Sequence, residues 1–427
     1  MPGGAPATGF GVLPRQYELA PAQRRVTRRP ASSSSKSCKE KIQLMTSRIV
    51  LDIREPARPY RGPAVLAAGH RPFFLAAGLY AALGLALWGS AYVGLLPLTA
   101  AWHGHEMVFG FAVAAISGFL MAAVPKWTGG PVIHGPLLAG LLLLWLAGRI
   151  AMAADVATWI DLLYLPVFAS FILVDIVRAR NARNYQVPAM LFGLAGLNAF
   201  YHFGDPGTAL HAAVYLIAAL IALIGGRIVP AFTQNALRLA LRNNIRCTTP
   251  RWLDVLAVPS VILVVAAELF LPYSPAAGVA ALVAGALLLV RMAGWQTFRT
   301  FGMPIVWILH VGYAWVPIGF LLTGIANLGP WIPHGAALHA LTAGAIGTMI
   351  LAVASRAALG HAGLPLVVSR GTVLAYALVI AGAVLRVLVP SGAALIVAGA
   401  LWSLGYALFA VIYWPILTRP RVDGLPG

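Results

Sequence analysis

Twelve apolar segments follow one another between residues 73 and 416, and each is long enough, or nearly so, to cross a bilayer as a helix. They cover residues 73–96, 102–124, 137–154, 160–178, 187–203, 208–229, 253–271, 276–294, 304–328, 334–355, 371–389 and 393–416. A helix rises 1.5 Å per residue, so about 20 apolar residues span a hydrocarbon core of roughly 30 Å. Helices also satisfy their own backbone hydrogen bonds, as a lipid environment requires. The sequence therefore predicts an all-α polytopic membrane protein of about 12 transmembrane helices.

Lys and Arg alternate between the connections of these segments in a way that predicts an orientation. The odd-numbered connections contain neither residue, whereas the even-numbered ones do, as at Lys126, Arg178 and Arg299. Because cytoplasmic connections carry the excess of Lys and Arg, we expect a multi-pass protein with both termini in the cytoplasm. The lipid bilayer is then its first partner.

The net charge of +18 does not indicate nucleic-acid binding, because its distribution is that of topology determinants. Thirteen of the thirty Lys and Arg residues precede Phe73, and most of the others flank apolar segments. Residues 1–60 are rich in Arg, Pro and Ser and are predicted to form a disordered basic cytoplasmic tail. We expect residues 61–419 to form the twelve-helix transmembrane domain and residues 420–427 a short cytoplasmic tail.

An internal repeat is visible when the segments are counted. The first, fifth and ninth begin with Pro72, Pro188 and Pro304, at an equal spacing of 116 residues. The second and sixth end in VPKWT and VPAFT, and the tenth in VASRA. This recurrence favours three four-helix units whose second, sixth and tenth helices are equivalent and face a common interior. Chance similarity among helices rich in Ala, Leu and Gly is the alternative interpretation.

The ten histidines fall into two layers under this topology. The outer layer contains His103, His105, His202, His211, His334 and His339, and the inner layer contains His70, His134, His310 and His361. Neutral imidazole is a common ligand of haem iron and copper, and ionisable groups at membrane depth usually mark function. The outer histidines are therefore candidate metal ligands, although a single interfacial histidine is more often solvated or a helix cap.

The second segment opens with Trp-His-Gly-His-Glu at residues 102–106. On a regular helix His103 and His105 point about 200° apart, so they cannot ligate one metal from the same helical face. Small residues follow His103 and His339 at helical spacing, which would let a flat haem, or simply another helix, approach closely. We expect haem ligands on the second and tenth helices, with Glu106 fixing a ligand tautomer or handling a proton.

Two arginines, Arg149 and Arg386, interrupt the apolar outer halves of the third and eleventh segments. They either extend to the interface or neutralise an anionic cofactor group on the outer side. At the inner ends, the motifs GGRIVPAFTQN and SRAALGHAG hold Arg227 and His361. These motifs either form a second ligand-binding site or are only helix ends that contain glycine.

Five sequence blocks resemble the NnrS family. They are HRPFFL, WHGHEMVFGF…GFLMAAVPKWTG, GGRIVPAFTQN, LHVGYAWVPIG and LHALTAGAIGTMILAVASRAALGHAG. The family is described as bacterial inner-membrane proteins that contain haem and copper and take part in resistance to nitric oxide. The resemblance implies haem b and copper as cofactors and nitric oxide or a related small molecule as partner. The resemblance also implies that the residues binding haem or metal are among His103, His105, His310, His339, His361, Arg227 and Arg356.

The repeat also resembles, by analogy alone, the three four-helix units of haem–copper oxidases and nitric oxide reductases. The three-histidine copper site expected there on helices 6 and 7 is missing, because the seventh segment contains no histidine. We therefore expect a haem-binding, and also copper-binding, protein that protects against nitrosative stress. The alternatives are a twelve-helix secondary transporter of a small solute or proton, and a haem oxidoreductase with quinol as partner. Whether the chain has catalytic turnover stays open.

Overall fold

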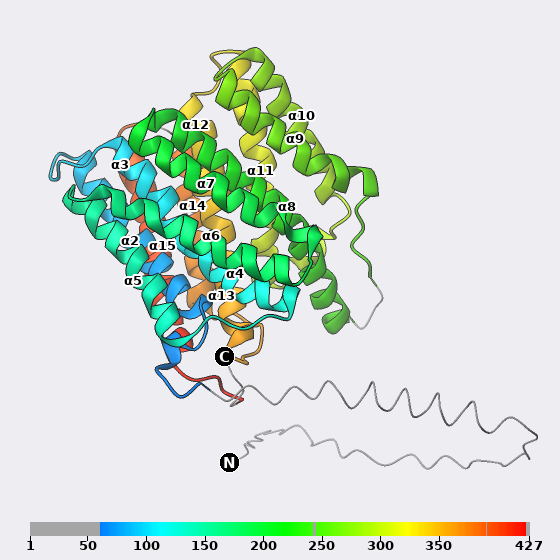
Figure 1. Cartoon of the computed structure of the whole chain (residues 1–427). Coiled ribbons are helices and arrows are strands. Elements are labelled where there is room, and N and C mark those ends of the chain that lie inside the picture. Colours follow the sequence, from blue (N-terminus) through cyan, green and yellow to red (C-terminus); the bar gives the residue numbers. More distant parts are fainter. Residues whose placement is uncertain (1–59, 242–244, 390, 424–427) are drawn as a thin grey trace, which may run out of the picture. The chain divides into compact units, whose positions relative to one another are not determined.

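The computed structural model describes residues 60–241, 245–389 and 391–423. The tail predicted over residues 1–60 lies outside these ranges except for residue 60. In the described part the chain contains twelve long helices and no strand (Figure 1). They are α2 (His70–Tyr92), the composite helix of α3 (Ala100–His105), η3 (Glu106–Ala112) and α4 (Val113–Thr128), α5 (Gly135–Ala154), α6 (Asp161–Arg178), α7 (Gln186–Phe203), α8 (Pro206–Leu241), α9 (Arg251–Phe270), α10 (Pro275–Met292), α11 (Pro304–Leu328), the composite helix of α12 (His334–His339), η7 (Ala340–Ile346) and α13 (Gly347–His361), α14 (Arg370–Leu388) and α15 (Ala393–Thr418).

Each predicted apolar segment corresponds to one of these helices, so the predicted all-α fold is confirmed. Eleven of the helices in the described ranges are long and apolar enough to cross a membrane. The exception is α7, whose hydropathy is lowered by Gln186, Asn198 and His202. The predicted sixth segment ended at residue 229, whereas α8 continues to Leu241.

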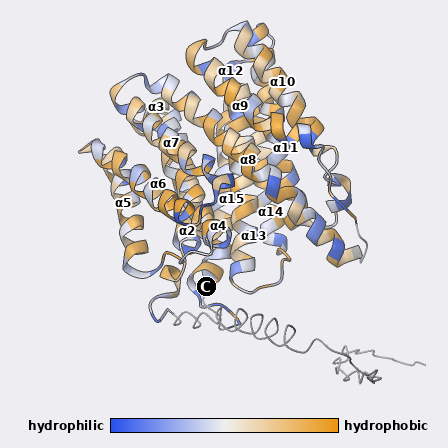
Figure 2. Ribbon diagram, turned by 45° about the vertical axis from the view of Figure 1, so that its right-hand side comes forward, coloured by the Kyte–Doolittle hydropathy of each residue, from blue (hydrophilic) through white to orange (hydrophobic). Residues whose placement is uncertain are grey.

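Hydrophobic residues run along most of each helix of the bundle (Figure 2). Large hydrophobic side chains point outward along the helices, as Leu83, Leu404 and Val411 do. Exposed apolar surface on this scale needs a lipid solvent, which makes the chain a multi-pass membrane protein. We call the end at which α3 and α12 begin the outer end, and the end at which α4 and α13 finish the inner end.

The second and tenth helices share an unusual construction. In each, a six-residue α-helix ends at a histidine, His105 or His339, and is followed by a seven-residue π-helix and then by α-helix again. The wider π turns are stabilised by tryptophans from neighbouring helices. Trp145 Nε1 donates a hydrogen bond to the Gly110 carbonyl, and Trp402 Nε1 donates one to the Ala343 carbonyl, both at 3.2 Å. The matched construction supports the predicted equivalence of these two helices.

An apolar cavity of about 70 Å³ lies where the second, sixth and tenth helices meet. Its lining includes Ala115 of α4, Ile221 of α8 and Ile350 of α13. The three helices that the sequence repeat predicts to be equivalent therefore do face a common interior.

We expect Trp402→Phe to lower the free energy of unfolding by about 1–2 kcal/mol, because it leaves the partly buried Ala343 carbonyl without its indole donor. Trp145→Phe should behave alike, since it removes the matching bond to Gly110. Denaturant unfolding in detergent measures both. The control is Trp414→Phe at an exposed position; an equal loss there would show that the indole hydrogen bonds contribute nothing specific.

Candidate metal centre and outer histidine pair

A cluster of buried ionisable side chains lies at the outer end, between α3, α5, α6 and α7. Its members are His105, Glu106, Arg149 and Asp161, all buried, together with the half-buried His202 and two polar neighbours, Tyr80 and Asn198. We call this group the outer charge cluster. Ionisable groups are seldom buried at membrane depth without a function or a specific partner.

Local sequence explains how these side chains come together. Asp161 is the first residue of α6, where a carboxylate is favoured by the positive end of the helix dipole. Asn198 and His202 lie four residues apart on α7 and so share one face. Gly148 lets α5 approach α6 closely, because a Cβ atom there would lie 3.1 Å from the Asp161 Cα.

Arg149 joins the two carboxylates of the cluster. Its Nη1 lies 2.7 Å from Glu106 Oε1, and its Nη2 contacts Asp161 Oδ1. The Tyr80 hydroxyl donates a hydrogen bond to Glu106 Oε2. Two carboxylates and one guanidinium leave a net charge of −1 when the histidines are neutral. Because burial makes an uncompensated charge costly, the cluster requires either a proton on a histidine or a bound cation.

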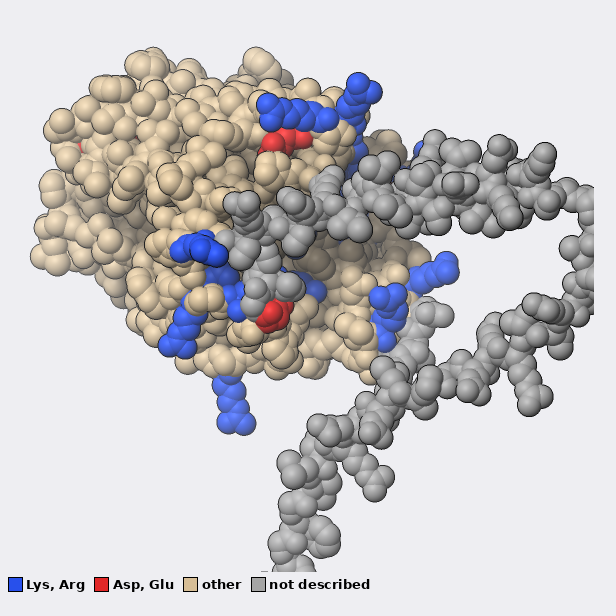
Figure 3. All heavy atoms as spheres, turned by 60° about the horizontal axis from the view of Figure 1, so that its bottom comes forward, with Lys and Arg blue, Asp and Glu red and all other residues tan. Residues whose placement is uncertain are grey.

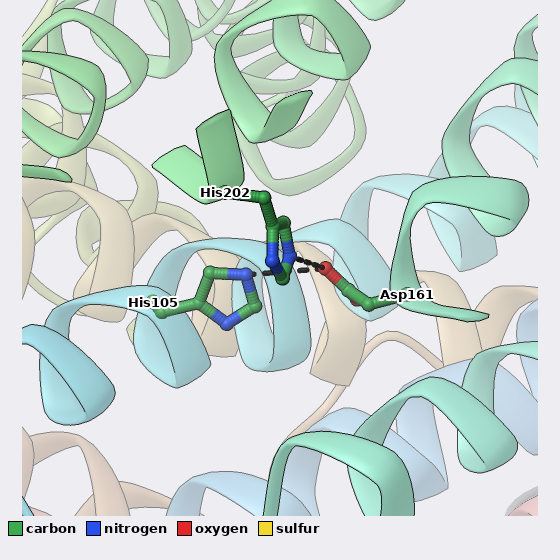
Figure 4. Close-up of side chains that lie close together, drawn as sticks. All are labelled: His105, Asp161 and His202. Carbon is green, nitrogen blue, oxygen red and sulfur yellow. Dashed lines mark hydrogen bonds and ion pairs between the residues drawn. The ribbon is translucent and has the colours of Figure 1, made fainter. Parts of the chain in front are cut away.

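His105 sits between the two acids. Its Nδ1 is 2.9 Å from Glu106 Oε1, and its Nε2 is 3.1 Å from Asp161 Oδ2 and 3.0 Å from Asn198 Oδ1. His202 Nε2 reaches the same Asp161 oxygen at 3.4 Å. One ligand atom each from His105, Asp161 and His202 lies within 4.8 Å of the others (Figure 4). Two imidazole nitrogens and one carboxylate oxygen form a donor set that suits divalent first-row metals.

His103 lies in a different environment from His105. Its ring stacks on Trp88, with centroids 4.9 Å apart and planes 15° apart. It is close enough to interact electrostatically with His339 of α12 and Arg386 of α14. We call His103 and His339 the outer histidine pair. His339 Nδ1 donates to the Gly335 carbonyl at 2.7 Å, which leaves its Nε2 as the atom with a lone pair.

Two polar atoms at the outer histidine pair lack a hydrogen-bond partner among the described residues, one in His103 and one in the neighbouring Arg386. His103 Nδ1 and Arg386 Nη1 are buried and make no hydrogen bond within the described part of the chain. Buried polar atoms are normally paired, so each unpaired atom requires an explanation. A ligand that offers lone pairs to Arg386 and a metal to the imidazoles would satisfy this environment.

His211 and His334 belong to a third outer group, apart from the other two. His334 Nε2 lies 3.1 Å from Asn327 Oδ1, and the Asn327 amide donates to Glu268 at 2.7 Å. The Tyr273 ring packs against both histidines. Burial and the nearby Glu268 carboxylate raise the pKa of the Tyr273 hydroxyl.

The inner candidates occupy separate environments. His310 is held on both ring nitrogens by hydroxyls, with Thr233 at 2.8 Å and Thr297 at 3.0 Å. His361 Nε2 lies 3.0 Å from Lys126 Nζ. Arg227 donates to Asn184 at 3.2 Å, and Arg356 lies 4.2 Å from the centroid of the Phe232 ring. The inner motifs thus bring these residues to different neighbours, and their assignment as ligands stays a prediction.

The structure refines the sequence-based assignments at the outer end. His103 and His105 were expected to serve different ligands, and they lie in two different groups. Arg149 was expected to extend to the interface or to neutralise a cofactor, whereas its guanidinium binds two carboxylates. Sequence reasoning missed Asp161, and it counted His202 only as one of six outer histidines without pairing it with His105. The available signals were an acidic first residue on an apolar helix and the four-residue spacing of Asn198 and His202.

A family profile described as "NnrS protein" matches residues 64–421 of the 427-residue chain. The chain belongs to the NnrS family. No curated protein matches it. The matched range contains all twelve helices, and therefore both the outer charge cluster and the outer histidine pair. Membership indicates a protein of the nitric oxide stress response from a family known to bind metal.

Proposed function

We propose that this NnrS-family protein binds haem and a second metal ion at its outer end, and that it protects the cell against nitric oxide. The observation that carries the proposal is the separation of His103 and His105 into environments of opposite charge. His103 faces Arg386, whereas His105 faces a cluster with a net charge of −1. The first environment suits an anionic cofactor with a metal at its centre, and the second suits a cation.

The outer histidine pair would hold haem b. The imidazoles of His103 and His339 would ligate its iron, and the unpaired Arg386 Nη1 would donate to an anionic group of the cofactor. Trp88, stacked on the His103 ring, would hold that ring in one orientation. The residues present therefore fit the cofactor that the family implies. When bound, haem supplies an iron that coordinates nitric oxide.

His105, Asp161 and His202 would hold the second metal ion, with copper as the family's candidate. With His105 Nδ1 donating a hydrogen bond to the Glu106 carboxylate at 2.9 Å, the lone pair of Nε2 lies on the side of Asp161, where the ion would be held. Arg149 occupies Asp161 Oδ1 and so leaves Oδ2 for the ion. A divalent cation would change the charge of the cluster from −1 to +1. The metal-free alternative is a doubly protonated His105 that donates to both carboxylates.

An optical spectrum and a metal analysis of the full chain, purified in detergent, test the proposal. We expect a Soret band and copper in a fixed ratio to protein. His339→Ala should remove or shift the Soret band because it deletes one candidate iron ligand, whereas the matched change His134→Ala, at an exposed position, should not. A colourless and metal-free protein would contradict the proposal. If that protein also moved a solute across vesicles, the transporter interpretation would replace it.

A further inference from the structure

Basic side chains gather at the inner end, at the opposite end of the bundle from the metal centre. Figure 3 shows Lys and Arg on this face with few acidic side chains among them. Five basic residues from three helices and the segment after α15 form what we call the inner basic cluster. They are His70 and Arg71 at the start of α2, Lys126 in the last turn of α4, His361 at the end of α13, and Arg421.

Most members of this cluster contact one another, and Arg421 also contacts an acid, Asp423. Lys126 Nζ lies 3.0 Å from His361 Nε2, and the His361 ring centroid lies 4.4 Å from that of His70. Arg71 interacts electrostatically with His70, His361 and Arg421, all of them basic. Its Nη1 donates to the carbonyls of Leu417 and Arg419, at 3.3 Å and 2.6 Å.

The charges of the cluster are not balanced by side chains of the described residues. Arg71, Lys126 and Arg421 contribute three fixed positive charges, and the recorded ion pairs supply one carboxylate, Asp423, which binds Arg421 at 2.6 Å. The difference, three minus one, is a charge of +2. Arg71 is only 1% exposed, and its Nε is buried without a hydrogen-bond partner in the described ranges. A buried, unpaired guanidinium nitrogen among cations requires an anion or an acceptor.

We propose that the inner basic cluster binds a phosphate group, either free inorganic phosphate or the phosphate of an anionic phospholipid headgroup. Guanidinium and ammonium groups are the side chains that most often bind phosphate, and the N-terminus of α2 adds its dipole. Inorganic phosphate carries a charge of about −1.5 to −2, close in size to the +2 of the cluster, whereas the phosphodiester of a lipid headgroup carries a single negative charge and would neutralise part of it. The side chains of His70 and Arg71 are buried, whereas that of Lys126 is exposed. Lys126 would therefore be the residue that a phosphate group meets first from the membrane surface.

Thermal unfolding of the full chain tests this proposal in two settings. In detergent, phosphate is titrated at constant ionic strength against chloride. In nanodiscs, phosphatidylcholine is compared with phosphatidylcholine that contains phosphatidylglycerol. We expect saturable stabilisation by the phosphate group in at least one setting. Lys126→Gln should weaken the apparent affinity about tenfold, because it removes one charge-assisted hydrogen bond. Lys126→Arg should keep it, as should Arg299→Gln, which removes an exposed charge elsewhere at the inner end.

The outcomes separate the two sources of phosphate. Stabilisation by inorganic phosphate that Lys126→Gln weakens assigns the site to the free ion. Stabilisation only by phosphatidylglycerol, weakened in Lys126→Gln and kept in Arg299→Gln, assigns it to a lipid headgroup. The proposal is wrong if neither compound shifts the unfolding midpoint. It is equally wrong if the wild type, Lys126→Gln and Arg299→Gln respond alike. Haem and metal contents are not read in this assay, so its failure leaves the proposed function standing.

Discussion

Replacement of Arg149 by Met should destabilise the protein by about 3–5 kcal/mol, the loss typical of removing one partner from a buried ion pair. Arg149 contacts both Glu106 and Asp161, which are 0% and 3% exposed. Without the guanidinium, the outer charge cluster holds two carboxylates and no fixed cation. Water does not reach these groups to compensate for the loss, so the variant should fold poorly. The midpoint of unfolding in detergent and the yield of membrane-inserted protein measure the effect.

Two further variants identify the cause of that loss. Arg178→Met removes an exposed arginine of α6 and should change the unfolding midpoint little, because surface charges contribute little. The double variant Arg149→Met/Asp161→Asn removes one carboxylate together with its cation, and it should recover part of the stability. If the double variant is no more stable than Arg149→Met alone, Arg149 acts through packing and the charge argument fails.

The fold could be predicted from sequence because lipid imposes two strong rules. A span must be apolar and about 20 residues long, and Lys and Arg accumulate on one side. These rules locate all twelve helices, α7 included, although its polar residues reduce its hydropathy. The π-helical segments could not be predicted. Their wide turns depend on indole donors from other helices, Trp145 and Trp402, and a single helix does not encode such partners.

The candidate site was only half predictable for a related reason. His105 and Glu106 stand out because they interrupt an apolar segment together. Asp161 becomes a ligand candidate, and His202 a partner of His105, only when α6 and α7 are known to lie against α3, which is a fact of tertiary packing. The pattern of one helix gives the direction of a side chain but not the neighbour that it meets. For this reason the division between His103 and His105 was predictable, whereas their partners were not.

The three outer groups also suggest why one repeated architecture would hold different ligands. Under the threefold repeat, α5, α9 and α14 are equivalent helices, and each carries one ionisable residue in its outer half: Arg149, Glu268 and Arg386. Arg149 is outweighed by two carboxylates, Glu268 has an amide partner, and Arg386 faces two histidines. A change of one ionisable residue in the outer half of this helix would therefore decide whether the unit favours a cation or an anionic cofactor.

Substitutions of His103 and His202 should separate the two proposed cofactors. In His103→Ala we expect the Soret band to disappear or shift while the second metal remains. In His202→Ala we expect the reverse, with the affinity for the second metal reduced at least about 100-fold, because even the outer partners of ligands contribute about 10–100-fold. His202 is suited to this test because its side chain, at 10% exposed, is the least buried of the three candidate ligands, and its loss removes one contact to Asp161.

The matched control for this pair is His211→Ala, a half-buried outer histidine that belongs to the third group and should affect neither cofactor. The unfolding midpoint of each variant is measured in parallel, so that general misfolding is recognised. If a folded His103→Ala protein keeps an unchanged Soret band, His103 is not an axial ligand. If a folded His202→Ala protein retains its metal, the His105–Asp161–His202 group is a proton-bearing charge cluster instead, with His105 donating to Glu106 and Asp161.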